Sequence, residues 1–93
     1  MKQVSIIKNG KESRSELFDP LKLHKSIVAA CLAVREFEGA ADVTAERVCK
    51  AVLDWLMTKD EVTSADLRRV AAKQLAVYQP EAAYIYEHHR MII

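Results

Sequence analysis

A turn-and-cap pattern close to the N-terminus constrains the fold of this chain more than any other feature. A short apolar run from Val4 to Ile7 leads to Asn9-Gly10, the dipeptide most typical of two-residue β-hairpin turns. Residues 11–18 can then return as a second strand. Asp19 and Pro20 follow as an N-cap and a first helical residue. The pattern predicts a β-hairpin that leads directly into a helix rich in lysine.

Apolar residues recur at helical spacing in the segments after the hairpin. The first helix is predicted over residues 20–36, with Leu23 and Ile27 on its buried face. Residues 38–42 interrupt the pattern, and Thr44 is expected to cap a second helix that ends near Lys59.

Two further helices are predicted in the C-terminal third. Residues 63–66, Thr-Ser-Ala-Asp, resemble a capping box with Asp in place of Glu, and they predict the start of a third helix. Pro80 predicts the start of a fourth, in which Ala83, Tyr84 and Tyr86 are expected to pack inward. The expected fold class is therefore α+β: an N-terminal β-hairpin packed on a bundle of about four α-helices.

Size and composition favour one small globular domain spanning residues 1–93. The hydrophobic fraction is 51% and the charged fraction 29%, as in chains that fold by themselves. Fourteen basic and thirteen acidic residues leave a net charge of +1, too balanced for a protein that coats nucleic acid. No run approaches the roughly 18 apolar residues of a membrane span, and no signal-peptide core is evident, so we expect a cytoplasmic protein without membrane contact.

The sequence contains no recognisable catalytic or metal-binding motif. The chain lacks a phosphate-binding Gly-x-x-x-x-Gly-Lys loop, and it has no Ser-His-Asp or Cys-His arrangement at a spacing typical of nucleophilic catalysis. We therefore expect no enzyme activity. His88 and His89 are adjacent, and adjacent helical residues point about 100° apart, so they cannot chelate one metal ion together. Cys31 and Cys49 lie in apolar helical contexts and are interpreted as core residues.

The order of short motifs along the chain carries a family resemblance. The motifs are Lys8-Asn9-Gly10, Glu16, Phe18-Asp19, Lys22-Leu23, Ser26-Ile27, Thr63-Ser64 with Leu67, and Ala83-Tyr84-Ile85 with Arg90. In order and spacing they resemble the ATP-cone, a regulatory nucleotide-binding module found in many ribonucleotide reductases and in the repressor of their genes. The resemblance covers nearly the whole chain.

The resemblance implies binding of ATP or dATP, with Mg²⁺ carried by the nucleotide, and regulation of a partner such as a ribonucleotide reductase or of self-association. It also implies a set of nucleotide-binding residues. These are Lys8, Asn9, Gly10, Glu16, Phe18, Lys22, Leu23, Ser26, Ser64, Leu67, Arg68 and Arg90.

The chemistry of these residue types suits a nucleotide, and each also has a plainer interpretation. Two lysines, Lys8 and Lys22, could neutralise a triphosphate, and Gly10 allows close approach of the backbone. Phe18, Leu23 and Leu67 are of the type that sandwich a purine, although core packing explains them equally well. Glu16 could accept a hydrogen bond from the base amino group or the sugar, or be a surface strand residue.

On the helical side, Arg68 could hold a phosphate through two hydrogen bonds, and Ser64 could meet the ligand or simply belong to a helix cap.

Two alternatives stay open. The family's Lys-Arg-Asp-Gly is shortened here to Lys8-Asn9-Gly10, which favours an ATP-cone-like interaction module that has lost its nucleotide. Residues 64–78, with Arg68, Arg69 and Lys73, could instead form a helix-turn-helix that reads DNA. The near-neutral charge and the preceding Asp60-Glu61 make DNA the weaker hypothesis.

Overall fold

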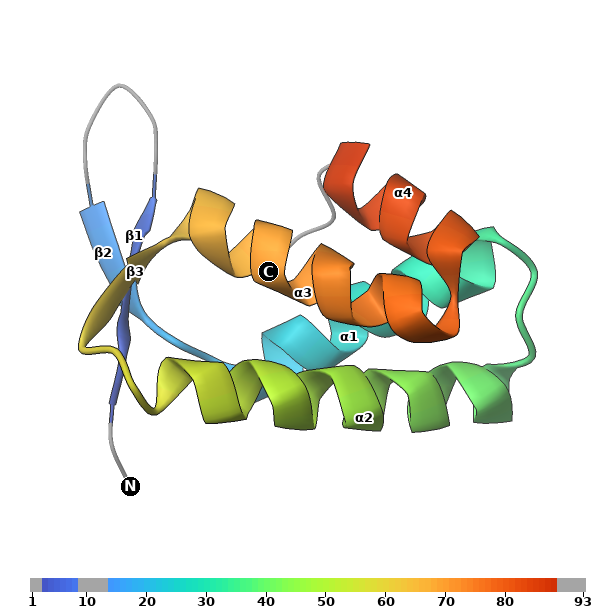
Figure 1. The fold of residues 1–93 in the computed structure, drawn as a ribbon, viewed down its shortest axis with the longest axis horizontal. Coiled ribbons are helices and arrows are strands. Elements are labelled where there is room, and N and C mark those ends of the chain that lie inside the picture. The colour runs from blue at the N-terminus through green and yellow to red at the C-terminus, as the bar shows by residue number, and fades with distance from the viewer. Residues whose placement is uncertain (1–2, 9–13, 89–93) are drawn as a thin grey trace.

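The computed structural model describes residues 3–8 and 14–88 of the chain. Three short strands form a sheet at one end of the molecule, and four helices extend away from it (Figure 1). This arrangement confirms the α+β class with a hairpin and four helices. It adds one strand that the sequence did not predict.

The N-terminal hairpin consists of β1 (Ser5–Lys8) and β2 (Arg14–Leu17), which pair antiparallel. The register places Lys8 opposite Arg14. A two-residue turn at Asn9-Gly10 would place Lys8 opposite Lys11, so that part of the prediction is wrong. The turn residues themselves lie outside the described part of the chain.

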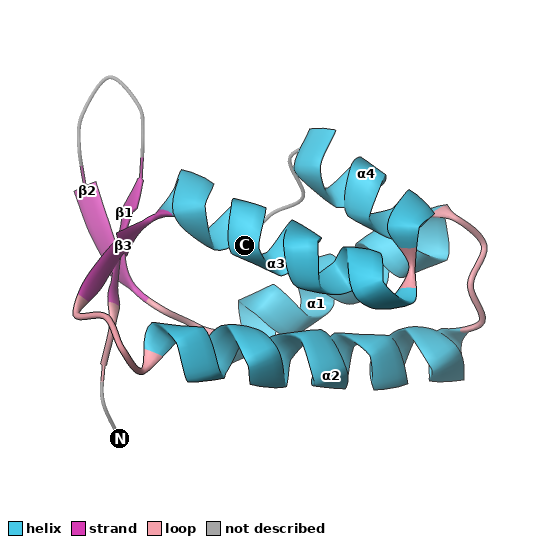
Figure 2. Cartoon of the chain, in the orientation of Figure 1, coloured by secondary structure: helices cyan, strands magenta, loops and turns pink. Residues whose placement is uncertain are grey.

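The third strand, β3 (Glu61–Thr63), pairs parallel with β1, so β1 is the central strand of the order β2-β1-β3. Val62 of β3 lies opposite Ile6, and both side chains are buried. Because β3 leads directly into the next helix, the sheet is tied to the helices at two places along the chain (Figure 2).

The first helix, α1 (Pro20–Ala33), begins as the sequence predicts: the Asp19 carboxylate accepts a hydrogen bond of 3.0 Å from the Leu21 amide. It ends three residues earlier than expected. Arg35 has φ of 65°, and the amides of Arg35 and Glu36 donate to the carbonyls of Leu32 and Cys31. These two bonds form a Schellman motif, which ends the helix.

The second helix, α2 (Glu38–Leu56), differs most from expectation because it starts six residues before Thr44. The supposed break at 38–42 is helical, and Ala41 and Ala45 are fully buried. Burial of these small residues outweighs the weak helix propensity of Gly39, whose position has open space around it. Thr44 is not a cap; its hydroxyl donates to Glu36 at 3.1 Å.

The last two helices are α3 (Ser64–Tyr78) and α4 (Pro80–His88), which begin where the sequence predicts. The Thr63 hydroxyl accepts a hydrogen bond of 3.0 Å from the Asp66 amide, which confirms the predicted cap. Ala83 and Tyr86 pack inward as expected, but Tyr84 is 62% exposed, so its predicted inward packing is wrong.

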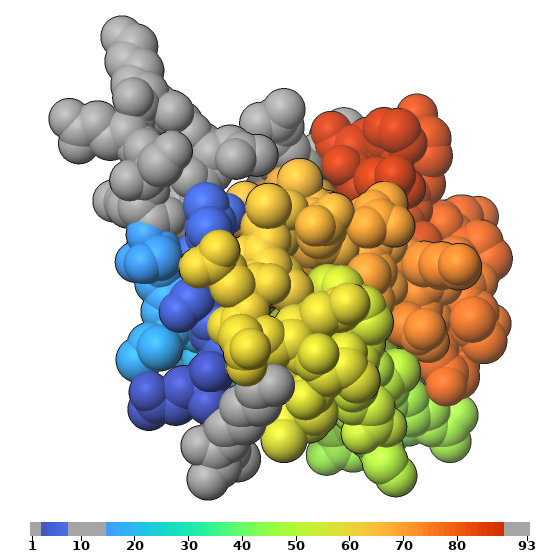
Figure 3. Space-filling view, turned by 60° about the vertical axis from the view of Figure 1, so that its left-hand side comes forward, coloured from blue at the N-terminus to red at the C-terminus, as the bar shows by residue number. Residues whose placement is uncertain are grey.

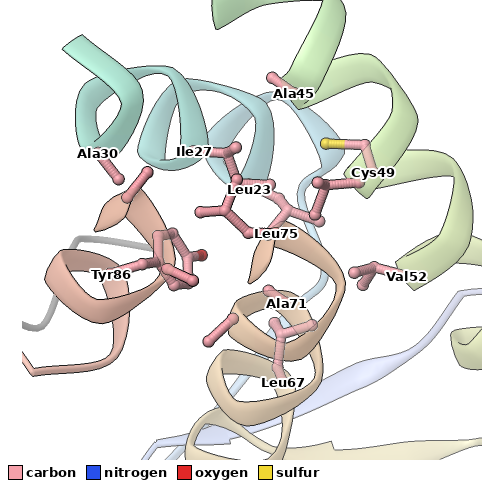
Figure 4. Close-up of a cluster of buried hydrophobic side chains, with 14 of the residues drawn as sticks. Leu23, Ile27, Ala30, Ala45, Cys49, Val52, Leu67, Ala71, Leu75 and Tyr86 are labelled. Atoms are coloured by element: carbon pink, nitrogen blue, oxygen red, sulfur yellow. The ribbon is translucent and has the colours of Figure 1, made fainter. Parts of the chain in front are cut away.

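One hydrophobic core joins all four helices and the inner face of the sheet. Figure 4 shows Leu23 and Ile27 of α1 facing Leu75 of α3, with Tyr86 of α4 beside them. Cys31 and Cys49 are buried free thiols, as predicted. Burial raises the pKa of each thiol to about 11. The core therefore packs the sheet against the start of α3.

Candidate functional site

A small hollow lies where the sheet meets the first turns of α1 and the start of α3. It brings together four of the predicted nucleotide-binding residues from separate elements: Glu16, Phe18, Lys22 and Leu67. Three further residues complete its lining, and none of them had been predicted as a ligand contact: Ile6, Leu17 and Asp19. The hairpin and the predicted helix cap place Glu16 and Lys22 on the same hollow.

The charged wall of the hollow is an ion pair between strand and helix. Lys22 Nζ lies 3.9 Å from Glu16 Oε2, and the two side chains remain 46% and 38% exposed. An ion pair this exposed contributes about 0–1 kcal/mol to stability. This pair therefore contributes little to the stability of the fold.

The hollow is narrow. Its volume is about 10 Å³, enough for roughly one water molecule, and Leu67 on its floor is fully buried. Nucleotide bases and phosphates need several hundred Å³. A nucleotide would therefore require the sheet to move away from α1 and α3.

Phe18 separates this hollow from a larger apolar groove. The groove has a volume of about 360 Å³ and runs between β2, the start of α1 and the end of α2. Phe18 and Leu17 line both spaces. A ligand that displaces Phe18 on one side would therefore change the shape of the other.

Leu23 and Ser26, predicted as nucleotide contacts, do not line the hollow. Leu23 is fully buried in the helical core and Ser26 is 5% exposed. The Ser26 hydroxyl donates to the Leu23 carbonyl at 2.7 Å, and its oxygen lies 2.9 Å from the Tyr86 hydroxyl. The structure thus gives both residues a place in the core, because α1 turns this face toward α4. Pairing of Ser26 with Tyr86 could not be inferred from two residues sixty positions apart.

The remaining predicted residues of α3, Ser64 and Arg68, lie one helical turn apart. Ser64 is buried, at 8% exposure, in the first turn after the Thr63 cap. Arg68 Nε is buried and has no hydrogen-bond partner among the described residues. A buried guanidinium donor without an acceptor costs free energy, so this position favours a ligand or water oxygen.

Arg68 also acts electrostatically on the core. Burial raises the pKa of Tyr86 to about 12, while the Ser26 hydrogen bond and the Arg68 charge oppose that rise. The Arg68 charge therefore acts on Tyr86, and neither Arg68 nor Ser64 lines the hollow. Of the two predicted cations, Lys22 lines the hollow and Arg68 does not.

Four other predicted positions carry no side-chain description. The Lys8 backbone belongs to β1, but its side chain is outside the described part, as are Asn9, Gly10 and Arg90.

Within the described residues, no cluster of three or more His, Cys, Asp or Glu side chains is suited to a metal ion. No described helix has the length and apolar character needed to cross a membrane.

Comparison with known proteins identifies no relative: no protein-family model, curated protein or solved structure matches the chain.

Proposed function

We propose that this chain is a regulatory module that binds ATP or dATP between its sheet and its helices, without turning the nucleotide over. One observation carries the proposal: Glu16, Phe18, Lys22 and Leu67 come from separate elements and line a single hollow. Arg68 lies outside the lining of the hollow, and its buried Nε has no acceptor among the described residues, so it is a donor that a wider site could use. A hydrogen-bond acceptor, an aromatic face and a cation in one hollow suit a base and its phosphates.

Regulation follows from the narrow unliganded hollow. Nucleotide must widen it and displace Phe18, and Phe18 also lines the apolar groove beside α2. A ligand shifts a conformational equilibrium only when it binds one arrangement more tightly than the other. Nucleotide binding would therefore change the surface offered to a partner. We propose that this partner is a ribonucleotide reductase or a second copy of the chain, with Mg²⁺ entering on the nucleotide.

The test is thermal unfolding with ATP, dATP, ADP or GTP, each with Mg²⁺. A ligand at about 100 times its dissociation constant stabilises by roughly 2.7 kcal/mol, which raises the midpoint of a domain this size by on the order of 10 °C. Lys22→Ala should abolish the shift. Lys25→Ala, an exposed lysine on the same helix that does not line the hollow, should retain it. An unchanged shift in Lys22→Ala would exclude the site.

A second function is favoured by the 10 Å³ volume of the hollow. If the hollow stays closed, the chain is an interaction module that presents its surfaces without nucleotide. The same experiment separates the two functions, because such a module shows no midpoint shift with any nucleotide.

A further inference from the structure

The outer faces of α3 and α4 form an open groove of about 410 Å³. Figure 3 shows the two helices adjoining on the molecular surface, with α4 (red) next to α3 (yellow to orange). The groove shares no lining residue with the hollow at Lys22. A molecule bound in the groove would therefore not contact the lining of the hollow.

The α3 wall combines small residues with cations. Arg69, Ala72, Lys73 and Ala76 lie at i, i+3, i+4 and i+7, which is one face of a helix. Arg69 Nη2 donates to Asp66 at 3.0 Å, and this bond lowers the pKa of Asp66. Lys73 is exposed, and no acidic side chain of the described residues lies within ion-pair distance. Asp66 offsets the charge of Arg69, so Lys73 is the cation of the α3 rim that has no acidic partner among the described residues.

The α4 wall repeats the same spacing with different chemistry. Pro80, Ala83, Tyr84 and Glu87 again lie at i, i+3, i+4 and i+7. Ala83 is buried in the floor, while Tyr84 is 62% exposed and packs its ring 4.3 Å from that of His88. The α4 rim thus offers an aromatic surface and one negative charge.

Two helical faces with an alanine floor have the shape that receives a third helix. Helices pack at interaxial distances of about 8–10 Å, and small residues allow the closer end of that range. A helix in a groove presents its own apolar residues at i, i+3, i+4 and i+7, which is the repeat found on both walls.

The rim charges select the sequence of that helix. We propose that the α3–α4 groove binds an amphipathic helix of a partner protein whose acidic residues face Lys73 on the α3 rim. Glu87 on the opposite rim repels a second acidic edge, so the charges also fix the direction in which the helix lies. The same carboxylate disfavours a nucleic-acid strand, which carries phosphates along both of its sides.

The probe is a synthetic helical peptide of about 14 residues, which is longer than the eight-residue stretch of helix that lines each wall of the groove. It carries Leu and Ala at the i, i+3, i+4 and i+7 positions and Glu along one flank. Binding is followed by backbone amide shifts of the isotopically labelled full chain. We expect the shifts to fall on α3 and α4 between residues 69 and 87.

Charge reversal then tests the orientation. Lys73→Glu should weaken binding of the acidic peptide by about fivefold, because it removes one exposed ion pair and places a like charge beside the peptide. The same variant should bind a matched peptide, with Lys in place of Glu, more tightly than the parent chain does. Lys50→Glu, on an exposed lysine of α2 that does not line the groove, should change neither affinity.

Four results would overturn the proposal. The first is an absence of α3 and α4 shifts at millimolar acidic peptide, and the second is equal affinity in Lys73→Glu and the parent chain. The third is concentration-dependent self-association through this face, which would make a second copy the occupant. The fourth is displacement of the peptide by a single-stranded oligonucleotide at lower concentration, which would make the groove a nucleic-acid site.

Discussion

At the residue scale, the buried hydroxyl groups of Tyr86 and Ser26 form a hydrogen bond inside the core. Tyr86 lies on α4 and is fully buried, and its hydroxyl lies 2.9 Å from Ser26 Oγ on α1. Burial raises the pKa of Tyr86 to about 12, so the phenol stays neutral and able to donate at ordinary pH. This hydrogen bond joins the first and last helices of the chain.

Tyr86→Phe removes the phenolic oxygen and keeps the ring. We expect a loss of about 1 kcal/mol in the free energy of unfolding, the typical net value of a neutral hydrogen bond. The Ser26 hydroxyl keeps its bond to the Leu23 carbonyl, so no buried donor is left unsatisfied. Urea unfolding measures the difference. Tyr84→Phe, on an exposed ring of the same helix, should change stability by a few tenths of a kcal/mol, and equal losses in the two variants would contradict this role.

The two buried thiols predict how stability depends on alkaline pH. Burial raises the pKa of Cys31 and Cys49 from 9.0 to about 11 in the folded chain, with the Glu36 charge as a smaller cause at Cys31. The unfolded chain therefore loses these protons first. The stabilisation is complete below pH 9 and is lost as pH rises toward 11.

Urea midpoints between pH 8 and pH 11 should therefore fall in the parent chain. The fall should be shallower in a Cys31→Ala, Cys49→Ala double variant, whatever its stability at pH 8. Identical slopes in the two proteins would show that the thiols do not contribute. Tyr86 remains in both proteins, and its raised pKa contributes to the slope that is left at the highest pH.

At the scale of elements, the start of α2 is held by packing without a polar cap. Its N-cap position is Phe37, whose side chain is 86% exposed and accepts no hydrogen bond. The backbone there has φ of −66° and ψ of 146°, the extended geometry that a capping residue adopts. A serine would fit without backbone change.

Phe37→Ser should stabilise the chain by about 1 kcal/mol, because its hydroxyl can accept from an amide in the first turn of α2. Phe37→Ala removes the same ring but supplies no acceptor, so it isolates the effect of the cap. Thermal unfolding of the two variants side by side measures it. If Ser is no more stable than Ala, the first turn of α2 is not limited by its missing cap.

Some elements of the fold could be predicted from the sequence, and others could not. The helix starts at Asp19-Pro20 and Thr63 could be predicted because a capping side chain accepts a hydrogen bond from an amide only two or three residues away. The strand Glu61–Thr63 was not, because its partner is Ser5–Ile7, far away in the chain, and three residues carry no detectable period. In the site, Glu16 and Lys22 were brought together by local hairpin and helix geometry, whereas Ser26 was drawn into the core by the distant Tyr86.

At the scale of the whole molecule, the sheet and the helical core differ in how they are held. The strands have three or four residues each, and β1 is the central one. The helices have 9 to 19 residues and share a continuous core. Short strands on the outside of a packed bundle belong to the parts of a fold that open at low free energy. The proposed widening of the hollow therefore requires only that the sheet opens, while the helical bundle stays folded.

Amide hydrogen exchange tests that division on the intact chain. Amides paired between β1 and β2 and between β1 and β3 should exchange faster than those of α2 between Ala45 and Val52, because the sheet opens without unfolding the bundle. Saturating ATP with Mg²⁺ should then slow exchange in the sheet and at the start of α3, and leave the middle of α2 nearly unchanged. Slowing by the same factor everywhere would mean that the sheet opens only when the whole domain unfolds. The nucleotide would then stabilise one rigid structure, and the hollow at Lys22 could not act as a switch.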